Sequence, residues 1–330
     1  MSMRRDERQP EESLAVGGQA VMEGVMMRNN NRITMAVRTP KGTIAYKEQA
    51  YTSWSKRWKP LGWPFVRGMV SLIEIMIIGM KAMIWSSNQA LGEEEEDFSV
   101  WELVGTIAFA IILSLALFKL LPLFLASAFQ ERTSANNLVF NLVDGGLKVL
   151  LLLGYLWLIS KMRDVRRLFE YHGAEHKSIN CYEQGRKLTV KNVLASSRFH
   201  PRCGTTFILF VVFTSILFYL LIPLSTGFWY KLLLRVAFLP VISGASFELI
   251  KLGGKHHEHP VMRVLLTPGM LLQRVTTREP DAKQAAVAIA SLTAALGGVG
   301  GASRGARRAS RTTREAKRPS ATPRQRRSPV

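Results

Sequence analysis

Residues 138–160 read LVFNLVDGGLKVLLLLGYLWLIS, and residues 161–167 read KMRDVRR. The first stretch is apolar over more than the ~20 residues that a helix needs to cross a bilayer. Asp144 and Lys148 interrupt it at i,i+4 spacing, where a carboxylate and an ammonium group can pair. The basic run that follows places this end in the cytoplasm by the positive-inside rule. The stretch therefore predicts a spanning helix and sets the direction of its neighbours.

Three further apolar runs take their direction from this helix. Residues 101–126 would run outward before it, residues 207–223 outward after it, and residues 232–250 back to the cytoplasm. Pro240 and Gly244 interrupt the last run, and broken helices are tolerated where they line a cavity or pack on protein. The fold is therefore predicted to be mainly α, a polytopic membrane helix bundle with about four spanning helices.

A fifth apolar run carries a narrow charged stripe. Arg67, Glu74 and Lys81 recur every seven residues, which places them on one face of a helix. Such a helix either lies in the membrane interface or packs its stripe inside a bundle, and the sequence leaves both open. Before it, residues 54–63 combine tryptophans with cations, which is typical of a membrane interface.

The chain divides into segments by composition. They are a disordered N-terminus at 1–15, a small β element at 16–60, the polar-striped helix at 61–92, two spanning helices within 101–160, a cytoplasmic site segment at 161–203, two spanning helices within 204–250, a His-rich loop and amphipathic helix at 251–299, and a basic disordered tail at 300–330. In the β element, residues 32–38 and 43–51 read as strands around a Pro-Lys-Gly turn, and the glycines between 15 and 28 as turn formers.

Charge and targeting signals favour a membrane protein with cytoplasmic ends. The formal net charge is +20, and residues 301–330 hold ten Arg or Lys and one Glu, so ten minus one gives +9 there. The first fifteen residues lack the apolar region of a signal peptide, so internal helices are expected to direct insertion. The expected partner is the lipid bilayer, and nucleic acid is expected only through the tail.

The transition-metal ligands are confined to one window. All six histidines lie between His172 and His259, and both cysteines, Cys181 and Cys203, lie there too. The predicted topology brings all of them to the cytoplasmic face. A chain that confines its imidazole and thiol groups in this way is predicted to build one site there.

The centre of this window reads YHGAEHK at residues 171–177. His172 and His176 share a helix face and can bind one zinc ion, and Glu175 beside them completes the H-x-x-E-H pattern of inverzincin metallopeptidases. In that pattern the glutamate is the general base, so Glu175 is the candidate catalytic residue. The alternative is a polar helix end near lipid headgroups.

Further ligands are needed, and four candidates remain open: His200, Cys203, Glu248 and His259. The expected cofactor is a divalent metal ion, with zinc favoured by imidazole and thiol donors. Glu248 could instead pair with Lys251 at the interface, and Cys203 could instead act as a nucleophile with a nearby histidine. Cys181 has no close partner and is expected to be a small buried side chain.

Several motifs together resemble one bacterial family. They are GQAVMEGVMMR at 18–28, YHGAEHK at 171–177, HPRCGT at 200–205, EHP at 258–260 and TTREP at 276–280. The chain resembles the YqhQ-type family over roughly residues 16–292, a domain of unknown function (number 1385) described as a predicted metal-dependent enzyme. The resemblance implies a multi-pass protein of the bacterial inner (plasma) membrane with a metal site, and it assigns neither a reaction nor ligands.

Two functions follow from these expectations. The first is a metal-dependent hydrolase at the cytoplasmic membrane face, acting on a membrane protein or a lipid-linked substrate. The alternative is a non-enzymatic membrane assembly or transport factor with a structural metal, supported by the broken helix, the charged stripe and Asp144.

Overall fold

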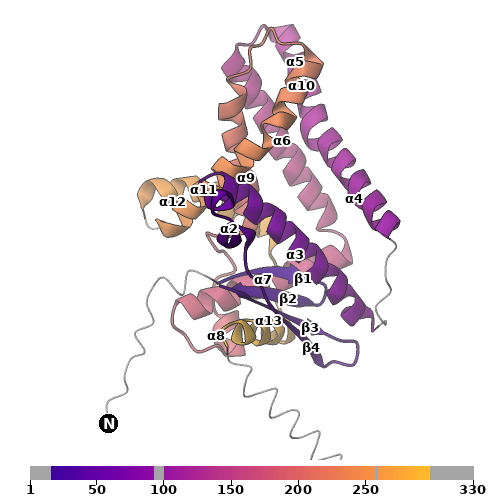
Figure 1. Ribbon diagram of the computed structural model, residues 1–330, viewed down its shortest axis with the longest axis vertical. Helices are drawn as coiled ribbons and strands as arrows, with labels where there is room; N and C mark the ends of the chain where they lie inside the picture. The colour runs from indigo at the N-terminus through magenta and orange to yellow at the C-terminus, as the bar shows by residue number, and fades with distance from the viewer. Residues whose placement is uncertain (1–15, 93–99, 257–258, 298–330) are drawn as a thin grey trace, which may run out of the picture.

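The computed structural model describes residues 16–92, 100–256 and 259–297 (Figure 1). A small four-stranded sheet and the helices packed on it form the base of the molecule. A group of apolar helices rises from this base. The prediction of a mainly helical chain with a small N-terminal β element is confirmed.

The sheet is an antiparallel meander in the order β1-β2-β3-β4. Its strands are β1 (Val16–Val21), β2 (Gly24–Asn29), β3 (Arg32–Arg38) and β4 (Ile44–Ala50). The last two match the predicted strands, whereas the glycine-rich segment predicted only as turns forms the hairpin β1–β2. Gly24 is needed there, because a Cβ would lie 2.3 Å from the carbonyl oxygen of Ala36.

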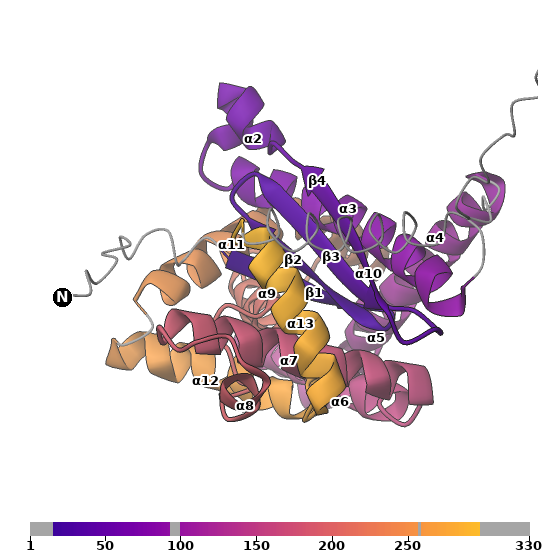
Figure 2. The ribbon, with the colours of Figure 1, turned by 90° about the horizontal axis from the view of Figure 1, so that it is seen from below.

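Helices pack on both faces of the sheet, although most of β4 is exposed. One face presents Val25, Met27 and Ala36 to α7 (Arg163–Glu183) and α13 (Ala282–Ala295). Figure 2 shows α13 lying across the strands beside α7 and the short α8 (Val190–Leu194). On the other face, Met35 and its neighbours pack against α3 (Val66–Leu91).

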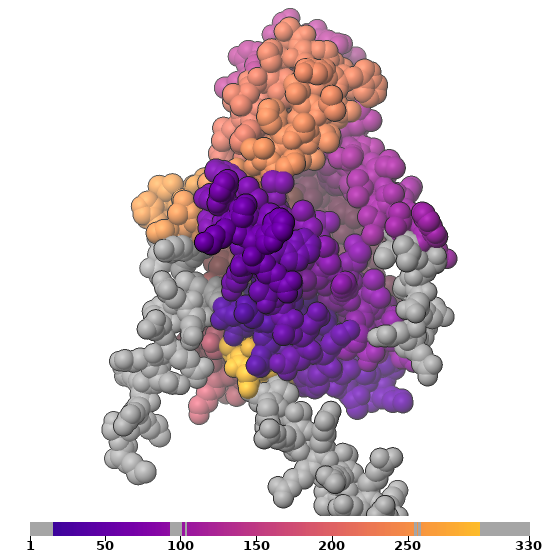
Figure 3. Space-filling model, viewed as in Figure 1, coloured from indigo at the N-terminus to yellow at the C-terminus, as the bar shows by residue number. Residues whose placement is uncertain are grey.

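The helix at the C-terminal end of the described chain is part of this core. A capping box formed by Asp281 and Gln284 starts α13, and Thr34 Oγ1 of β3 donates to the carbonyl oxygen of Ser291 at 2.8 Å. The amphipathic helix predicted within residues 251–299 is therefore confirmed at Ala282–Ala295, and most of it is buried. The first strands and the last helix meet at the base of the molecule (Figure 3).

Three helices are long and apolar enough to cross a membrane. They are α3, the continuous helix over Val104–Thr133, and α6 (Asn137–Ile159). The second consists of α4 (Val100–Leu115), a π-helical segment η2 (Ala116–Leu120) and α5 (Leu121–Thr133). Many large apolar side chains on these helices are exposed, which is compatible with a membrane protein.

The two remaining predicted spans differ from the prediction in their length and in their bend. α9 (Gly204–Tyr219) has 16 residues, about 24 Å of helix, which is shorter than the ~30 Å hydrocarbon core. α10 (Phe228–Ala237) and α11 (Leu239–Lys255) meet at a 45° bend and count together as a fourth candidate.

The bend between α10 and α11 lies at the predicted proline. Pro240 is in the first turn of α11, where a backbone N–H would have no hydrogen-bond partner within the helix. The predicted break at Gly244 is wrong, because α11 continues through it and packs its backbone against Phe65. A helix that was not predicted, α12 (Pro260–Thr276), follows the histidine-rich residues, of which 257–258 lie outside the described chain.

The charged stripe of α3 packs partly inward. Arg67 and Glu248 of α11 form an ion pair at 2.5 Å. Glu74 is buried and accepts hydrogen bonds from Ser53 Oγ and from the backbone N–H of Trp54, which fixes the short helix α2 (Trp54–Arg57) on α3. Lys81 is exposed. The stripe therefore makes separate contacts with two neighbouring elements.

A buried ionic cluster lies inside the helix bundle. The predicted pair is present, with Lys148 Nζ 2.5 Å from Asp144 Oδ2. Arg235 of α10 adds a second cation, with Nη1 2.8 Å from Asp144 Oδ1 as an ion pair without hydrogen-bond alignment, and Nη2 2.8 Å from Asn141 Oδ1. Lys119 of η2 donates to the Tyr219 hydroxyl at 3.1 Å. The Asp144 carboxylate therefore pairs with two cations, one from α6 and one from α10.

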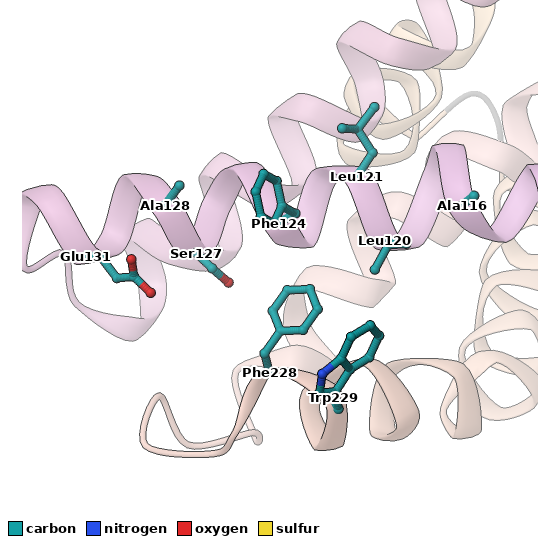
Figure 4. Close-up of a pocket in the computed structure, with 9 residues that line it drawn as sticks. All are labelled: Ala116, Leu120, Leu121, Phe124, Ser127, Ala128, Glu131, Phe228 and Trp229. Atoms are coloured by element: carbon teal, nitrogen blue, oxygen red, sulfur yellow. The ribbon is translucent and has the colours of Figure 1, made fainter.

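An apolar groove of about 710 Å³ lies beside η2 and α5. Figure 4 shows Phe228 and Trp229 of α10 across this groove from Leu120 and Phe124. Trp229 is 73% exposed on the outside of the bundle, whereas Phe228 is half-buried and packs against the cluster around Leu123. The groove is therefore a feature of the apolar surface and is separate from the histidine-rich base.

Candidate metal centre

Three potential metal ligands meet between α7 and the start of α9. His172 and His176 project from one face of α7, as their spacing predicts, and Cys203 is the N-cap residue of α9. One ligand atom from each lies within 4.8 Å of the other two. The His172 Nε2 atom is 3.4 Å from Cys203 Sγ, and the two imidazole rings are 4.4 Å apart at their centroids.

Backbone carbonyl groups fix both imidazole rings. Nδ1 of His172 lies 2.8 Å from the carbonyl oxygen of Thr276, and Nδ1 of His176 lies 2.6 Å from that of Arg198. A carbonyl oxygen can only accept, so each Nδ1 carries the proton and each Nε2 keeps its lone pair. Metal-binding histidines are held by this kind of hydrogen bond in most proteins. The donor set, two imidazoles and one thiol, fits zinc.

Glu175 lies buried next to these ligands. Its Oε2 atom is 4.0 Å from Nε2 of His172. Burial raises the pKa of its carboxyl group to about 7, although a charge on His172 would lower it. Gly18 of β1 allows this position, because a Cβ there would lie 2.7 Å from the Glu175 Cγ atom. Near neutral pH this carboxyl group can therefore both accept and donate a proton.

His200 lies beside the three potential ligands, but its ring contacts Glu183 and the backbone of Arg202. Its ring centroid is 5.7 Å from that of His176. Its Nε2 atom is 3.4 Å from Oε2 of Glu183, and its Nδ1 atom accepts from the backbone N–H of Arg202 at 3.3 Å. Burial lowers the pKa of His200, although the hydrogen bond with Glu183 opposes this shift. His200 therefore supports the loop that carries Cys203.

Glu248 and His259 lie outside the group of three potential metal ligands. Both Glu248 oxygens bind Arg67, at 2.6 and 2.5 Å. His259 is the exposed N-cap residue of α12. Among the described residues, the group that could hold a metal consists of His172, His176 and Cys203. Cys181 is buried among Val193 and Ala285, as predicted for a small apolar side chain.

The segment over 276–280 is a part of the site that sequence reasoning missed. Gly173 lies between the two histidines, and a Cβ there would be 1.9 Å from the carbonyl oxygen of Arg278. The backbone N–H of Arg278 in turn donates to the carbonyl oxygen of Phe169 at 2.9 Å. Only glycine lets this segment approach α7 closely enough for Thr276 to reach His172. Gly173 within the motif was the available signal.

The ligand group opens into a cleft of about 580 Å³. Strand β1 and residues of β2 form one wall, and α7 with the loop before α9 forms another. Ile75 of α3 and Phe247 of α11 line the remaining side. Three protein ligands next to an open cleft are typical of a catalytic zinc site, whereas structural sites usually have four.

Comparison with known proteins agrees with the resemblance seen in the motifs. Residues 63–298 match the family described as "Protein of unknown function (DUF1385)". The chain is 37% identical over 290 residues to "Uncharacterized protein YqhQ" of Bacillus subtilis (strain 168), covering 84% of this chain and 91% of that protein. No solved structure gives a significant match. The chain therefore belongs to the DUF1385 family of proteins of unknown function.

Proposed function

We propose that this protein is a metal-dependent hydrolase of the bacterial plasma membrane. His172, His176 and Cys203 would hold a divalent ion, for which zinc is the best fit. The observation that carries the proposal is the pair of carbonyl contacts to the two Nδ1 atoms, which leaves both Nε2 lone pairs available near the Cys203 thiol.

The chemistry follows from the groups around the cleft. A bound zinc ion supplies a Lewis acid. Glu175 would take a proton from the attacking water and return it to the leaving group, because its carboxyl group lies beside His172 and lines the cleft. Glu175 is buried but lines the cleft, so a water molecule in the cleft can reach its carboxyl group. The reaction class that results is hydrolysis of an ester or amide bond at the membrane surface.

The proposed placement has the base in the cytoplasm. The chain would cross the membrane several times, with both termini on the cytoplasmic side. Support comes from the basic run at 161–167 that joins α6 to the site helix α7, and from the exposed Trp58 and Trp63 between the sheet and α3. In this orientation the cleft lies at the cytoplasmic face.

Metal content tests the proposal directly. Purified chain, prepared without chelator, is expected to hold about one zinc ion, as a three-ligand catalytic site does. The His172→Ala/His176→Ala variant is expected to hold none, and the measurement is mass spectrometry of the metal. The matched control is His256→Ala/His259→Ala, which removes two exposed histidines outside the group. Wild-type protein that is folded but free of metal would contradict the proposal.

The same atoms allow a second chemistry. Cys203 Sγ and His172 Nε2 are 3.4 Å apart, so the thiol could act as a nucleophile with the imidazole as its base. Alkylation of Cys203 by iodoacetamide separates the two cases. A metal-bound thiolate is protected until chelator is added, whereas a nucleophilic thiol reacts without chelator. Cys181→Ala, which removes the other thiol, serves as the background for this measurement.

A non-enzymatic assembly or transport factor is the second candidate function. It is favoured by the ionic cluster around Asp144 and by the bent pair α10–α11, since such features occur where membrane proteins move ions or partners. In that case the metal would be structural, and the proton-carrying role of Glu175 would be dispensable.

Gly173→Ala is expected to weaken metal binding by roughly 10- to 100-fold, the usual effect of losing a hydrogen bond to a ligand histidine. The added methyl group meets a backbone carbonyl, so the 276–280 segment must move and Thr276 must leave His172. The affinity is measured by competition with a zinc chelator. Gly154→Ala in α6, where a Cβ would have open space, is the control. Equal zinc affinity in both variants would show that the carbonyl contact does not matter.

A further inference from the structure

The cleft beside the proposed metal ligands carries more positive than negative charge. Its described lining contains three cations, Arg28, Lys56 and Arg202, and one acid, Glu175. Arg202 forms an ion pair with Glu183, which lies behind the lining. Two cations therefore remain to face a ligand.

Arg28 and Lys56 are not neutralised by the protein in the ranges that the structure describes. Arg28 stacks on the Tyr51 ring at 4.9 Å, and Lys56 Nζ donates to Asn31 Oδ1 at 3.3 Å. Neither contact removes a positive charge, and within the described residues neither cation has an acidic partner. Both are therefore available for an anion in the cleft.

Lys56 is held at the cleft by the neighbouring helix. It lies on α2, and the buried Glu74 of α3 accepts from Ser53 Oγ and Trp54 N at the start of that short helix. Because Glu74 anchors α2, the position of the Lys56 backbone is fixed relative to the site. The cation is thus part of a built arrangement and not an isolated surface lysine.

The side of the cleft away from the sheet is apolar. Ile75 and Phe247 line it, and Ile75 is 45% exposed. Phe247 belongs to α11, which together with α10 is a candidate membrane span. In the proposed placement α11 leaves the membrane beside the cleft, so Phe247 lies near the lipid. The cleft is therefore cationic on one side, and on the other it is apolar and close to the membrane of the proposed placement.

We infer that the cleft binds an amphiphile with a phosphate headgroup. The phosphate lies between Arg28 and Lys56 next to the three metal ligands, and the hydrocarbon chain leaves past Ile75 and Phe247 into the bilayer. This inference rests on the proposed function, because it names the substrate class of the same site.

Size and charge agree with this ligand. The cleft of about 580 Å³ is within the ~300–1,000 Å³ typical of small-molecule sites. A phosphate alone would leave most of it unfilled, whereas a headgroup with the first part of its chain would occupy it. A phosphate monoester carries −1.5 to −2 charges at pH 7, which is close to what two cations neutralise.

The test uses full-length protein in a non-ionic detergent with four probes. They are dioctanoyl phosphatidic acid, dioctanoylglycerol, glycerol 3-phosphate and inorganic phosphate. Affinity is measured by isothermal calorimetry. Phosphatidic acid is expected to bind at least tenfold more tightly than each of the others, because only it offers both the charge and the chains.

Two variants test the assigned contacts. Arg28→Gln and Lys56→Gln are each expected to weaken phosphatidic acid binding roughly tenfold, as the loss of one charge-assisted contact does. Arg57→Gln is the matched control, because Arg57 is exposed, adjacent to Lys56 and absent from the described lining. It is expected to bind as the wild type does. Arg28 is half-buried and Lys56 is exposed. The thermal unfolding midpoint of each variant confirms that it is folded.

Several results would overturn the inference. Equal affinity for glycerol 3-phosphate and phosphatidic acid would assign the site to a soluble phosphate compound. If dioctanoylglycerol bound as tightly as phosphatidic acid, the phosphate group would not contribute to binding. An Arg57→Gln variant as impaired as Arg28→Gln would indicate unspecific attraction by a basic surface.

The inference and the proposed function can fail separately. Wild-type protein that holds zinc but ignores phosphatidic acid would contradict the inference alone. Protein that binds phosphatidic acid through Arg28 and Lys56 but holds no metal would contradict the proposed function alone. Calorimetry and metal analysis on the same preparation distinguish these results.

Discussion

A chain with Glu175→Gln is expected to keep its metal and to lose activity by roughly 10²–10⁴-fold, the usual contribution of a positioned acid–base group. Glutamine has nearly the same shape, so the contact with Gly18 and the positions of His172 and His176 are retained. The amide cannot take up a proton, so the proton transfer proposed for the Glu175 carboxyl group would be lost.

The measurement is rescue of a deletion strain, combined with metal analysis of the purified variant. The control is Asp164→Asn, which neutralises an exposed acid in the first turn of the same helix and should cost only a few tenths of a kcal/mol in stability. Full rescue by Glu175→Gln together with no rescue by His176→Ala would show that the metal is structural, and the assembly-factor candidate would then be preferred.

Asp144→Asn is expected to lower the free energy of unfolding by about 3–5 kcal/mol, the range found when one partner of a buried ion pair is removed. The carboxylate is 1% exposed, and it lies 2.5 Å from Lys148 and 2.8 Å from Arg235. Without it, both cations remain inside the bundle with no counter-charge. The measurement is a denaturant titration of purified protein in detergent.

Two variants serve as comparisons. Lys148→Met is expected to cost less than Asp144→Asn, because Arg235 still neutralises the carboxylate. Glu131→Gln on α5 removes an exposed acid and should change stability by no more than about 0.5 kcal/mol. If Asp144→Asn were as mild as Glu131→Gln, the cluster would contribute nothing to the stability of the bundle.

The features that the sequence predicted correctly are local in the chain. Asp144 and Lys148 are four residues apart on one helix, and His172 and His176 share a helix face for the same reason. Pro240 bends the helix pair within two residues of its own position. In each case helical geometry alone relates the residues, so no knowledge of packing is needed.

The features that were missed depend on contacts between distant segments. Glu248 lies within the histidine-rich window in the sequence, but Arg67 of α3 binds both of its oxygens. The glycine-rich hairpin β1–β2 was predicted to form only turns. In the structure, Gly18 and Gly24 lie in strands and leave room for Glu175 and for the backbone of Ala36. α12 begins with Pro260 and contains Pro268, so its helical pattern was hidden by two residues that usually interrupt helices.

The packing of α13 on the sheet has a consequence for biosynthesis. Met27 and Ala36 in the first strands are buried by Val287 and Leu292 near the end of the described chain. At 5–20 residues per second, a ribosome needs roughly 10–50 s to make the intervening residues. During this time the apolar helices are expected to enter the membrane while one face of the sheet stays uncovered. A nascent chain stalled before residue 280 should therefore be sensitive to protease in its first 50 residues.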